Sequence, residues 1–142
     1  MATCLWLTGR ARAGKSTIAR AVADELGRSG TAVVLLDEDV RSHLVDGRAP
    51  IAWLVRVLTE AGVTTIVASD LPARADREHV REAVTQFVEV FVDGGGATSD
   101  DDSYEEPFAP ELRVPTHDRE PTASIALVVS WLEHSGELHA AE

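Results

Sequence analysis

The segment Gly9–Ser16 has the residue types and the spacing that bind phosphate groups: a glycine, four residues, then Gly-Lys-Ser. Glycine lets the backbone curl so that its N–H groups point inward and donate hydrogen bonds to phosphate oxygens. We expect Lys15 to reach the β- and γ-phosphates of a nucleotide and the hydroxyl of Ser16 to ligate Mg²⁺. The residues predicted to bind the nucleotide are Gly9, Arg10, Ala11, Arg12, Ala13, Gly14, Lys15, Ser16 and Thr17.

The neighbours of this segment are those that a phosphate-binding loop needs. Residues 3–8 are apolar and rich in strand-forming side chains, and residues 16–26 have the pattern of a helix, whose N-terminal dipole attracts anions. Lys15 is the only lysine in a chain with 13 lysines and arginines together. A glycine-rich turn without a ligand would share the spacing, but the strand before it and the helix after it favour phosphate binding.

Strand-like and helix-like segments alternate along the chain, a pattern typical of a parallel sheet. We predict one α/β domain over residues 1–142, a three-layer sandwich of the P-loop NTPase type with a mostly parallel sheet of four to five strands. Residues 93–102 are rich in glycine and aspartate, so we expect a mobile loop there, and residues 136–142 form a predicted tail. The predicted strands are residues 3–7, 31–36, 63–68, 87–92 and 111–114, and the predicted helices are residues 15–28, 50–61, 72–86 and 121–134.

Three aspartates follow predicted strands, at the edge where open parallel sheets bind their ligands. Asp37 and Asp39 come after the second strand, where we expect them beside the phosphate loop, and Asp70 comes after the third. One aspartate could hold Mg²⁺, for which we select Asp37 together with Ser16, and another could accept the proton of an attacking hydroxyl. Each could instead cap a helix or lie in a solvated loop, and capping explains Asp70 equally well.

Several arginines are placed to bind negative charge. Arg10 and Arg12 lie in the phosphate loop and could fold over the γ-phosphate. Arg41, Arg74 and Arg77 follow strand ends and could hold an anionic acceptor. The predicted catalytic residues are Lys15, Asp37, Asp39 and Arg12, and the predicted acceptor-binding residues are Arg41, Asp70 and Arg74.

The arginines of the predicted helix 72–86 have a second interpretation. On an exposed helix face, arginines pair with acids three or four residues away. Such pairing would join Arg77, Glu78, Arg81 and Glu82. We favour it for Arg81 and keep Arg74 as a ligand of the acceptor.

The composition argues against several classes of partner. The formal net charge of -11 disfavours nucleic acid and anionic membrane surfaces, so local arginines have to hold an anionic substrate. The sequence has no N-terminal signal and no apolar run of about 18 residues, which predicts a cytoplasmic protein. The one cysteine, Cys4, is predicted to be a buried thiol outside any disulfide. The five histidines lack metal-ligand spacing, so no zinc site is expected.

Two tryptophans lie on predicted helices with wide apolar faces. We expect Trp53 and Trp131 in the core or at a subunit interface, rather than stacked on a ligand. The second position would make the chain a homodimer, and the sequence does not choose between the two.

Five segments of the chain form a recognisable series. They are the loop Gly9–Thr17, Leu-Asp-Glu-Asp-Val-Arg at 36–41, Pro-Ala-Arg-Ala-Asp-Arg at 72–77, Glu-Val-Phe-Val-Asp at 89–93, and Asp-Ser-Tyr-Glu-Glu-Pro at 102–107 running into 110–112. Taken in this order, they resemble the adenylylsulfate (APS) kinase family. The resemblance implies ATP-dependent phosphorylation of the ribose 3′-hydroxyl of APS, with Mg²⁺. It also implies that Asp37 or Asp39 lies near the acceptor hydroxyl and the metal, and that Arg41 and Arg74 contact the acceptor.

The chain departs from the family's pattern in the half of the site that would hold the acceptor. Only Val40 separates Asp39 from Arg41, where the family has two residues, and the segment before Pro50 is shortened. Residues 69–71 lack the family's phenylalanine, which would stack on the acceptor's adenine. Residues 94–101 replace a basic lid and contain no arginine or lysine. Arg10 and Arg12 could supply the missing charge from the loop itself.

Two functions fit these observations. The first is a phosphotransferase that moves the γ-phosphoryl group of ATP to a hydroxyl of APS or another small molecule. The second is a catalytically weak nucleotide-binding protein of the same descent. The intact Lys15, Ser16, Asp37 and Asp39 favour the enzyme, and the missing lid favours the second function. A GTPase is disfavoured because its Asn-Lys-x-Asp motif needs a lysine that this chain does not have.

Overall fold

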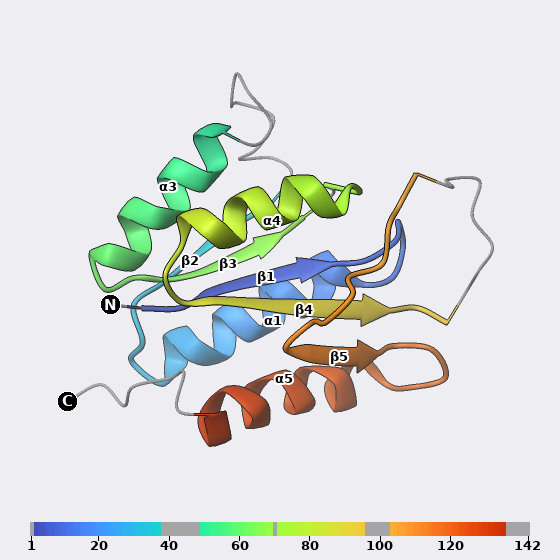
Figure 1. Ribbon diagram of the computed structural model, residues 1–142. Helices are drawn as coiled ribbons and strands as arrows, with labels where there is room; N and C mark the ends of the chain where they lie inside the picture. Colours follow the sequence, from blue (N-terminus) through green and yellow to red (C-terminus); the bar gives the residue numbers. More distant parts are fainter. Residues whose placement is uncertain (1, 38–48, 70, 96–102, 136–142) are drawn as a thin grey trace.

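Short runs of apolar and β-branched residues form a five-stranded sheet with helices on both faces (Figure 1). The computed structural model describes residues 2–37, 49–69, 71–95 and 103–135. The order of strands in the sheet is β2-β3-β1-β4-β5. The elements are β1 (Cys4–Thr8), α1 (Lys15–Arg28), β2 (Val33–Leu36), α3 (Ala49–Glu60), β3 (Thr64–Ala68), α4 (Arg74–Ala83), β4 (Phe87–Asp93), β5 (Leu112–Pro115) and α5 (Pro121–Ser135).

The central strand β1 is parallel to both of its neighbours. Leu5 lies opposite Ile66 of β3 on one side and Val88 of β4 on the other. The outer pairs β2–β3 and β4–β5 are also parallel. The prediction of a mostly parallel α/β sheet is therefore confirmed. Because the strand pairs are all parallel, the carboxyl ends of the strands lie at the same edge of the sheet, the edge toward which the arrows in Figure 1 point.

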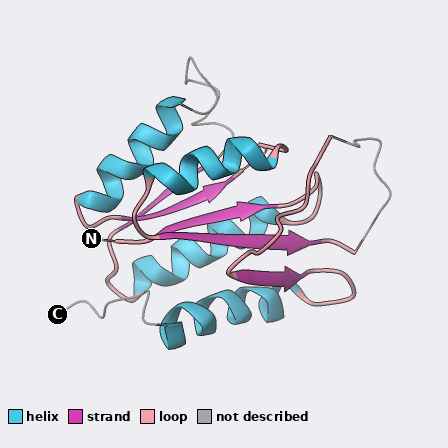
Figure 2. Ribbon diagram, viewed as in Figure 1, coloured by secondary structure: helices cyan, strands magenta, loops and turns pink. Residues whose placement is uncertain are grey.

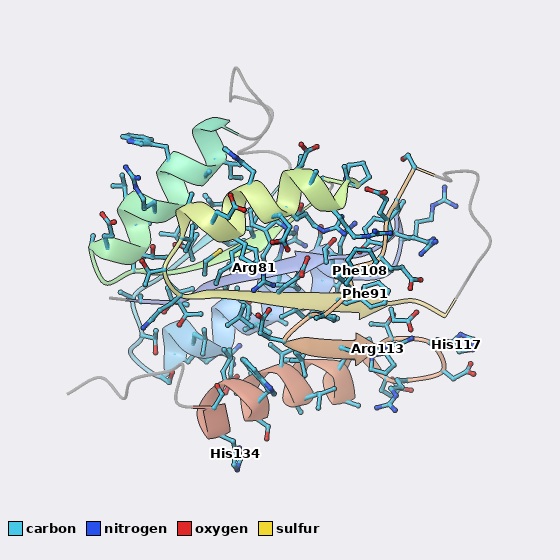
Figure 3. The ribbon with its side chains drawn as sticks, viewed as in Figure 1. Arg81, Phe91, Phe108, Arg113, His117 and His134 are labelled. Carbon is cyan, nitrogen blue, oxygen red and sulfur yellow. The ribbon has the colours of Figure 1, made fainter. Side chains whose placement is uncertain are left out.

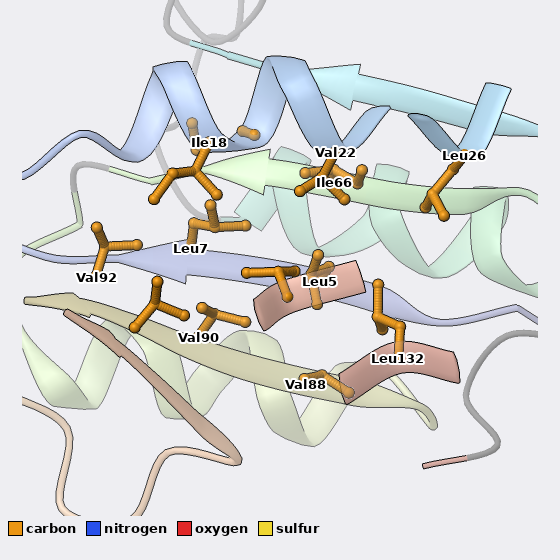
Figure 4. Packing of buried hydrophobic residues seen from close by; sticks show 14 of the residues in the cluster. Leu5, Leu7, Ile18, Val22, Leu26, Ile66, Val88, Val90, Val92 and Leu132 are labelled. Carbon is orange, nitrogen blue, oxygen red and sulfur yellow. The ribbon is translucent and has the colours of Figure 1, made fainter. Parts of the chain in front are cut away.

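Alternate residues of β1 enter two separate cores, because successive side chains of a strand point to opposite faces. Leu5 and Leu7 pack in the cluster between the sheet and the helices α1 and α5 (Figure 4). Cys4 and Trp6 pack in the cluster under α3 and α4. Figure 2 shows the resulting three layers, with one helix pair on each face of the sheet. Burial raises the pKa of the Cys4 thiol above its usual value, as expected for a buried cysteine.

The helix predicted over residues 72–86 is shorter at both ends. Ala73 is extended, and the backbone N–H of Arg74 donates to a carboxylate oxygen of Glu105 at 2.9 Å, so a distant residue caps the helix start. Val84 is extended with φ −120° and ψ 125°, a conformation that suits a β-branched side chain and leads directly into β4. The contact between Arg74 and Glu105 could not be predicted from local sequence, because the two residues are 31 positions apart.

The two tryptophans have different environments. Trp131 packs against the core between α1 and α5. Trp53 is 61% exposed, so its placement in the core is wrong. Its neighbour one turn along, Val57, is also exposed. A subunit interface at Trp53 remains a prediction.

Some predictions fall on residues that the structure does not describe. They concern Asp39, Arg41 and Asp70, most of the loop 93–102, and the tail 136–142. In the described part of the chain, no helix has the length and apolarity to cross a membrane. The same residues contain no group of three or more histidine, cysteine, aspartate or glutamate side chains that could hold a metal ion.

Candidate nucleotide-binding site

The phosphate loop connects the carboxyl end of β1 to the first turn of α1. Gly9 lies against β4 so closely that a Cβ atom there would overlap the carbonyl oxygen of Val92. Gly14 has φ 104°, a conformation that side chains rarely adopt. Both glycines of the motif are thus required by the local backbone. Arg12 has φ 67° and takes the left-handed conformation at a cost of about 1–2 kcal/mol.

Lys15 folds back over the loop that precedes it. Its Nζ donates hydrogen bonds to the backbone carbonyl of Gly9 at 2.5 Å and to that of Arg10 at 3.4 Å. Gly14 caps α1 without a side-chain hydrogen bond, so the helix N-terminus presents backbone dipoles to the loop. The ammonium and these dipoles lie together at the loop, an arrangement that suits an anion.

The sheet order determines which side chains flank the loop. β3 lies directly beside β1, and the N–H of Ser69 donates to the carbonyl of Leu7 at 2.9 Å. The half-buried Asp37 directly follows β2, which is separated from β1 by β3. Asp37 therefore lies at the same carboxyl edge of the sheet as the loop, but it follows a strand that is not adjacent to β1. Its expected position beside the phosphate loop stays a prediction. Asp70, the residue after Ser69, lies outside the described residues.

On the other side of the loop, β4 and β5 contribute polar groups that the sequence analysis did not select. The hydroxyl of Thr116, just after β5, donates to the carbonyl of Ala13 at 2.7 Å. Asp93 forms an ion pair with Arg113. The hydrogen bonds from Arg113 and from the backbone N–H of Gly95 lower the pKa of Asp93. The position of Thr116 directly after a strand could have identified it from the sequence, because ligands of open parallel sheets bind at the carboxyl ends of the strands.

Residues 103–107, which we call the strap, lie across the space between α4 and the phosphate loop and contact both. Tyr104 of the strap is buried, and its hydroxyl lies 2.9 Å from the hydroxyl of Thr8 at the end of β1. Its ring stacks on Phe91 with the ring centroids 6.3 Å apart. Burial raises the pKa of the Tyr104 hydroxyl, so it stays protonated at neutral pH and can act as the donor. The strap therefore closes one side of the loop.

Arg77 holds the strap from the side of α4. The side chain is 1% exposed, and its Nε donates to a carboxylate oxygen of Glu89 at 3.2 Å. One terminal nitrogen donates to the carbonyls of Leu71 and Pro72 at 3.0 and 2.8 Å, and the other donates to the carbonyl of Glu105. The interpretation of Arg77 as part of an exposed helix face is wrong, because its partners lie on β4, on the strap and before α4.

Arg74, the predicted acceptor ligand, also contacts the strap and the residues after it. Its Nε donates to the carbonyl of Glu106 at 2.8 Å. Its guanidinium carbon lies 3.8 Å above the ring of Phe108, which is 86% exposed. In this arrangement Arg74 fixes the backbone of the strap.

Arg81 pairs with acids, as the sequence analysis favoured. It lies 2.7 Å from Glu111 and 3.2 Å from Glu89, and its contact with Glu78 on the same helix is longer, at 3.5 Å (Figure 3). Burial by itself would raise the pKa of Glu111, but hydrogen bonds from Arg81 and from the N–H of Glu89 outweigh it and lower that pKa. The hydrogen bonds raise the pKa of Arg81.

Glu111→Gln is expected to destabilise the chain by about 1 kcal/mol at pH 7, because it removes the charge that Arg81 binds with two hydrogen bonds. A lowered folded-state pKa gives stability that is present above the unfolded-state value of about 4.3 and is lost as the pH falls through the folded-state value. The deficit of the variant should therefore shrink in acid. Urea unfolding at pH 7 and pH 3.5 measures it, with Glu78→Gln as the exposed control. An equal deficit at both pH values would contradict the prediction.

A groove of about 360 Å³ lies between α4 and residues 107–109, beside Arg81 and Phe108 (Figure 3). Arg74, Arg77 and Glu89 also line it, and no residue of the phosphate loop does. Its charged side chains already pair with one another. The groove is therefore separate from the phosphate loop.

The comparisons with known proteins agree with this geometry. The family model described as adenylylsulphate kinase matches residues 1–99. The adenylyl-sulfate kinase of Microcystis aeruginosa is 32% identical, over 96% of this chain and 94% of that one. A hexameric APS kinase from Thiobacillus denitrificans is 33% identical with a TM-score of 0.81, over 98% of this chain and 30% of that one. An APS kinase of Mycobacterium tuberculosis, solved with AMPPNP and APS, shares the fold at 22% identity and a TM-score of 0.78, over 93% of this chain and 98% of that one.

A parallel sheet whose central strand runs into a Gly-x₄-Gly-Lys-Ser loop and a helix defines the P-loop NTPases as a class. The match to the family model covers more than half of the residues, and relatives above 30% identity span nearly the whole chain. The chain belongs to the adenylylsulphate kinase family, a family of ATP-dependent kinases.

Proposed function

We propose that the chain transfers the γ-phosphoryl group of ATP to a hydroxyl of a small molecule, which is APS or a related compound. The observation that carries the proposal is the phosphate loop, in which Gly9 and Gly14 are required by the backbone and Lys15 folds back onto the loop. The relatives, named adenylyl-sulfate kinases, support APS as the first acceptor to test.

The roles of the site residues follow the chemistry of phosphoryl transfer. The loop backbone and Lys15 hold the phosphates, and Arg12, exposed on the loop, would face the transferring group. Ser16 at the start of α1 and Asp37 at the end of β2 offer the oxygen donors that Mg²⁺ prefers. When bound, Mg²⁺ neutralises negative charge on the β- and γ-phosphates. Asp39 is the proposed base, and Arg41, Asp70 and Arg74 the proposed acceptor ligands.

A catalytically weak nucleotide-binding protein is the second candidate function. Residues 94–101, in the place of the family's lid, contain no arginine or lysine. Charge that stabilises the transferring group can be worth about 10³–10⁵ in rate, so its loss would leave binding without efficient transfer.

The test is phosphoryl transfer from Mg·ATP to APS, followed by the appearance of phosphorylated APS and ADP. We expect both products in equal amounts. If APS is inert, the release of ADP is screened against other hydroxylated metabolites. A chain that binds ATP but phosphorylates none of these acceptors would support the weak nucleotide-binding protein, and a chain that does not bind ATP would exclude both functions.

A further inference from the structure

Arg10 extends from the phosphate loop toward the strap. One terminal nitrogen of its guanidinium lies 3.2 Å from a carboxylate oxygen of Glu106, and its guanidinium carbon lies 5.3 Å from the ring centroid of Tyr104. The Arg10 side chain is 29% exposed and that of Glu106 is 59% exposed. The ion pair is therefore accessible to solvent and formed through a single contact, and ion pairs of this kind are weak.

The position of Arg10 leaves one of its donors without a partner. Its Nε is buried and has no hydrogen-bond partner among the residues that the structure describes. A buried donor that makes no hydrogen bond is unfavourable, so this position of the guanidinium is marginally stable. Two oxygens of a phosphate group near the loop would accept two parallel hydrogen bonds from the guanidinium in place of one.

The strap backbone around Glu106 is held from α4. The backbone carbonyl of Glu106 accepts a hydrogen bond from Arg74 at 2.8 Å, and the neighbouring Glu105 is bound by Arg74 and Arg77. When a nucleotide binds, the strap backbone can keep its position while the ion pair between the two side chains opens.

We propose that Glu106 is a positioning residue for Arg10, an inference that rests on the proposed function. In the empty site Glu106 holds the guanidinium at the strap, and the terminal phosphate of ATP competes for it. Binding of ATP therefore includes the breaking of the Arg10–Glu106 ion pair. The apparent affinity for ATP is then the intrinsic affinity multiplied by the fraction of molecules in which Arg10 is released from Glu106.

Glu106→Gln should tighten the binding of a non-hydrolysable ATP analogue with Mg²⁺ two- to fivefold, because the amide holds the guanidinium less strongly. Arg10→Ala should weaken binding, and Glu106→Gln should have no effect in the Arg10→Ala background. Glu106→Asp keeps the charge and should restore the affinity of the original chain. Glu25→Gln is the matched control, because Glu25 forms an exposed pair with Arg28 at 2.8 Å on α1, away from the loop.

Titration calorimetry gives these dissociation constants, and kinetics with an active acceptor should show a lower KM for Glu106→Gln with little rise in kcat. The proposal fails if Glu106→Gln binds the analogue as the original chain does, or if its effect persists without Arg10. Failure of the proposed function is distinguishable. An original chain that binds the analogue but transfers no phosphoryl group overturns the proposed function and leaves the role of Glu106 open to this test, whereas an original chain that does not bind the analogue overturns both.

Discussion

Arg77→Ala is expected to remove about 3–5 kcal/mol of folding stability, the largest effect of any single substitution that we predict. The change leaves the buried carboxylate of Glu89 with Arg81 as its remaining ion-pair partner. It also removes the donors to three backbone carbonyls. Since a domain of this size is stable by about 5–15 kcal/mol, the variant would lie close to unfolding.

Urea unfolding measures this loss, with Arg28→Ala as the control. Arg28 also forms an ion pair on a helix, but its side chain is 72% exposed, so its removal should cost less than about 0.5 kcal/mol. If Arg77→Ala does not fold, Arg77→Lys is the variant to measure. It keeps the charge with fewer donors, so its loss of stability should lie between the losses expected for Arg77→Ala and Arg28→Ala. Equal losses of stability in Arg77→Ala and Arg28→Ala would contradict the prediction.

Lys15→Ala is expected to abolish the stabilisation of the chain by ATP and to lower phosphoryl transfer by about 10²–10³. The ammonium supplies positive charge at the loop, and the substitution leaves only backbone dipoles and the loop arginines. For the original chain, ATP at 100 times its dissociation constant should raise the unfolding free energy by about 2.7 kcal/mol, seen as a higher Tm.

The thermal shift is measured with and without Mg·ATP for both chains. Lys15→Arg is the informative companion, because it keeps the charge but replaces a slim ammonium with a broad planar group. We expect it to recover little of the effect. An undiminished ATP-dependent shift in Lys15→Ala would show that the nucleotide does not bind at this loop.

The layers of the fold could be predicted because the pattern that specifies them is local. Runs such as residues 63–68 and 87–92 consist mostly of apolar and β-branched residues, which indicates strands covered on both faces, and helical segments lie between them. The phosphate loop could also be predicted, because its glycines form a local motif. Gly14 is needed for its positive φ, and Gly9 is needed because it lies against the neighbouring strand β4.

The order of the strands and the partners of the arginines could not be read in the same way. The position of β3 between β1 and β2 moves Asp37 one strand away from the loop, and no local pattern encodes it. Arg77 lies in a charged helical segment that is typical of a solvated face. Its burial depends on Glu89 and on Glu105, which lies 28 residues further along. Long-range pairing of this kind overrides helix periodicity.

The match to the family model ends at residue 99, yet the site does not. Tyr104 and Thr116, both beyond that point, bond to Thr8 and to Ala13. The last helix also completes the hydrophobic cluster under α1. A fragment that ends where the family-model match ends, or a chimera joined there, would therefore lack the residues that bond to the phosphate loop and to the end of β1. The sensible unit for transplantation or truncation is the chain through the end of α5.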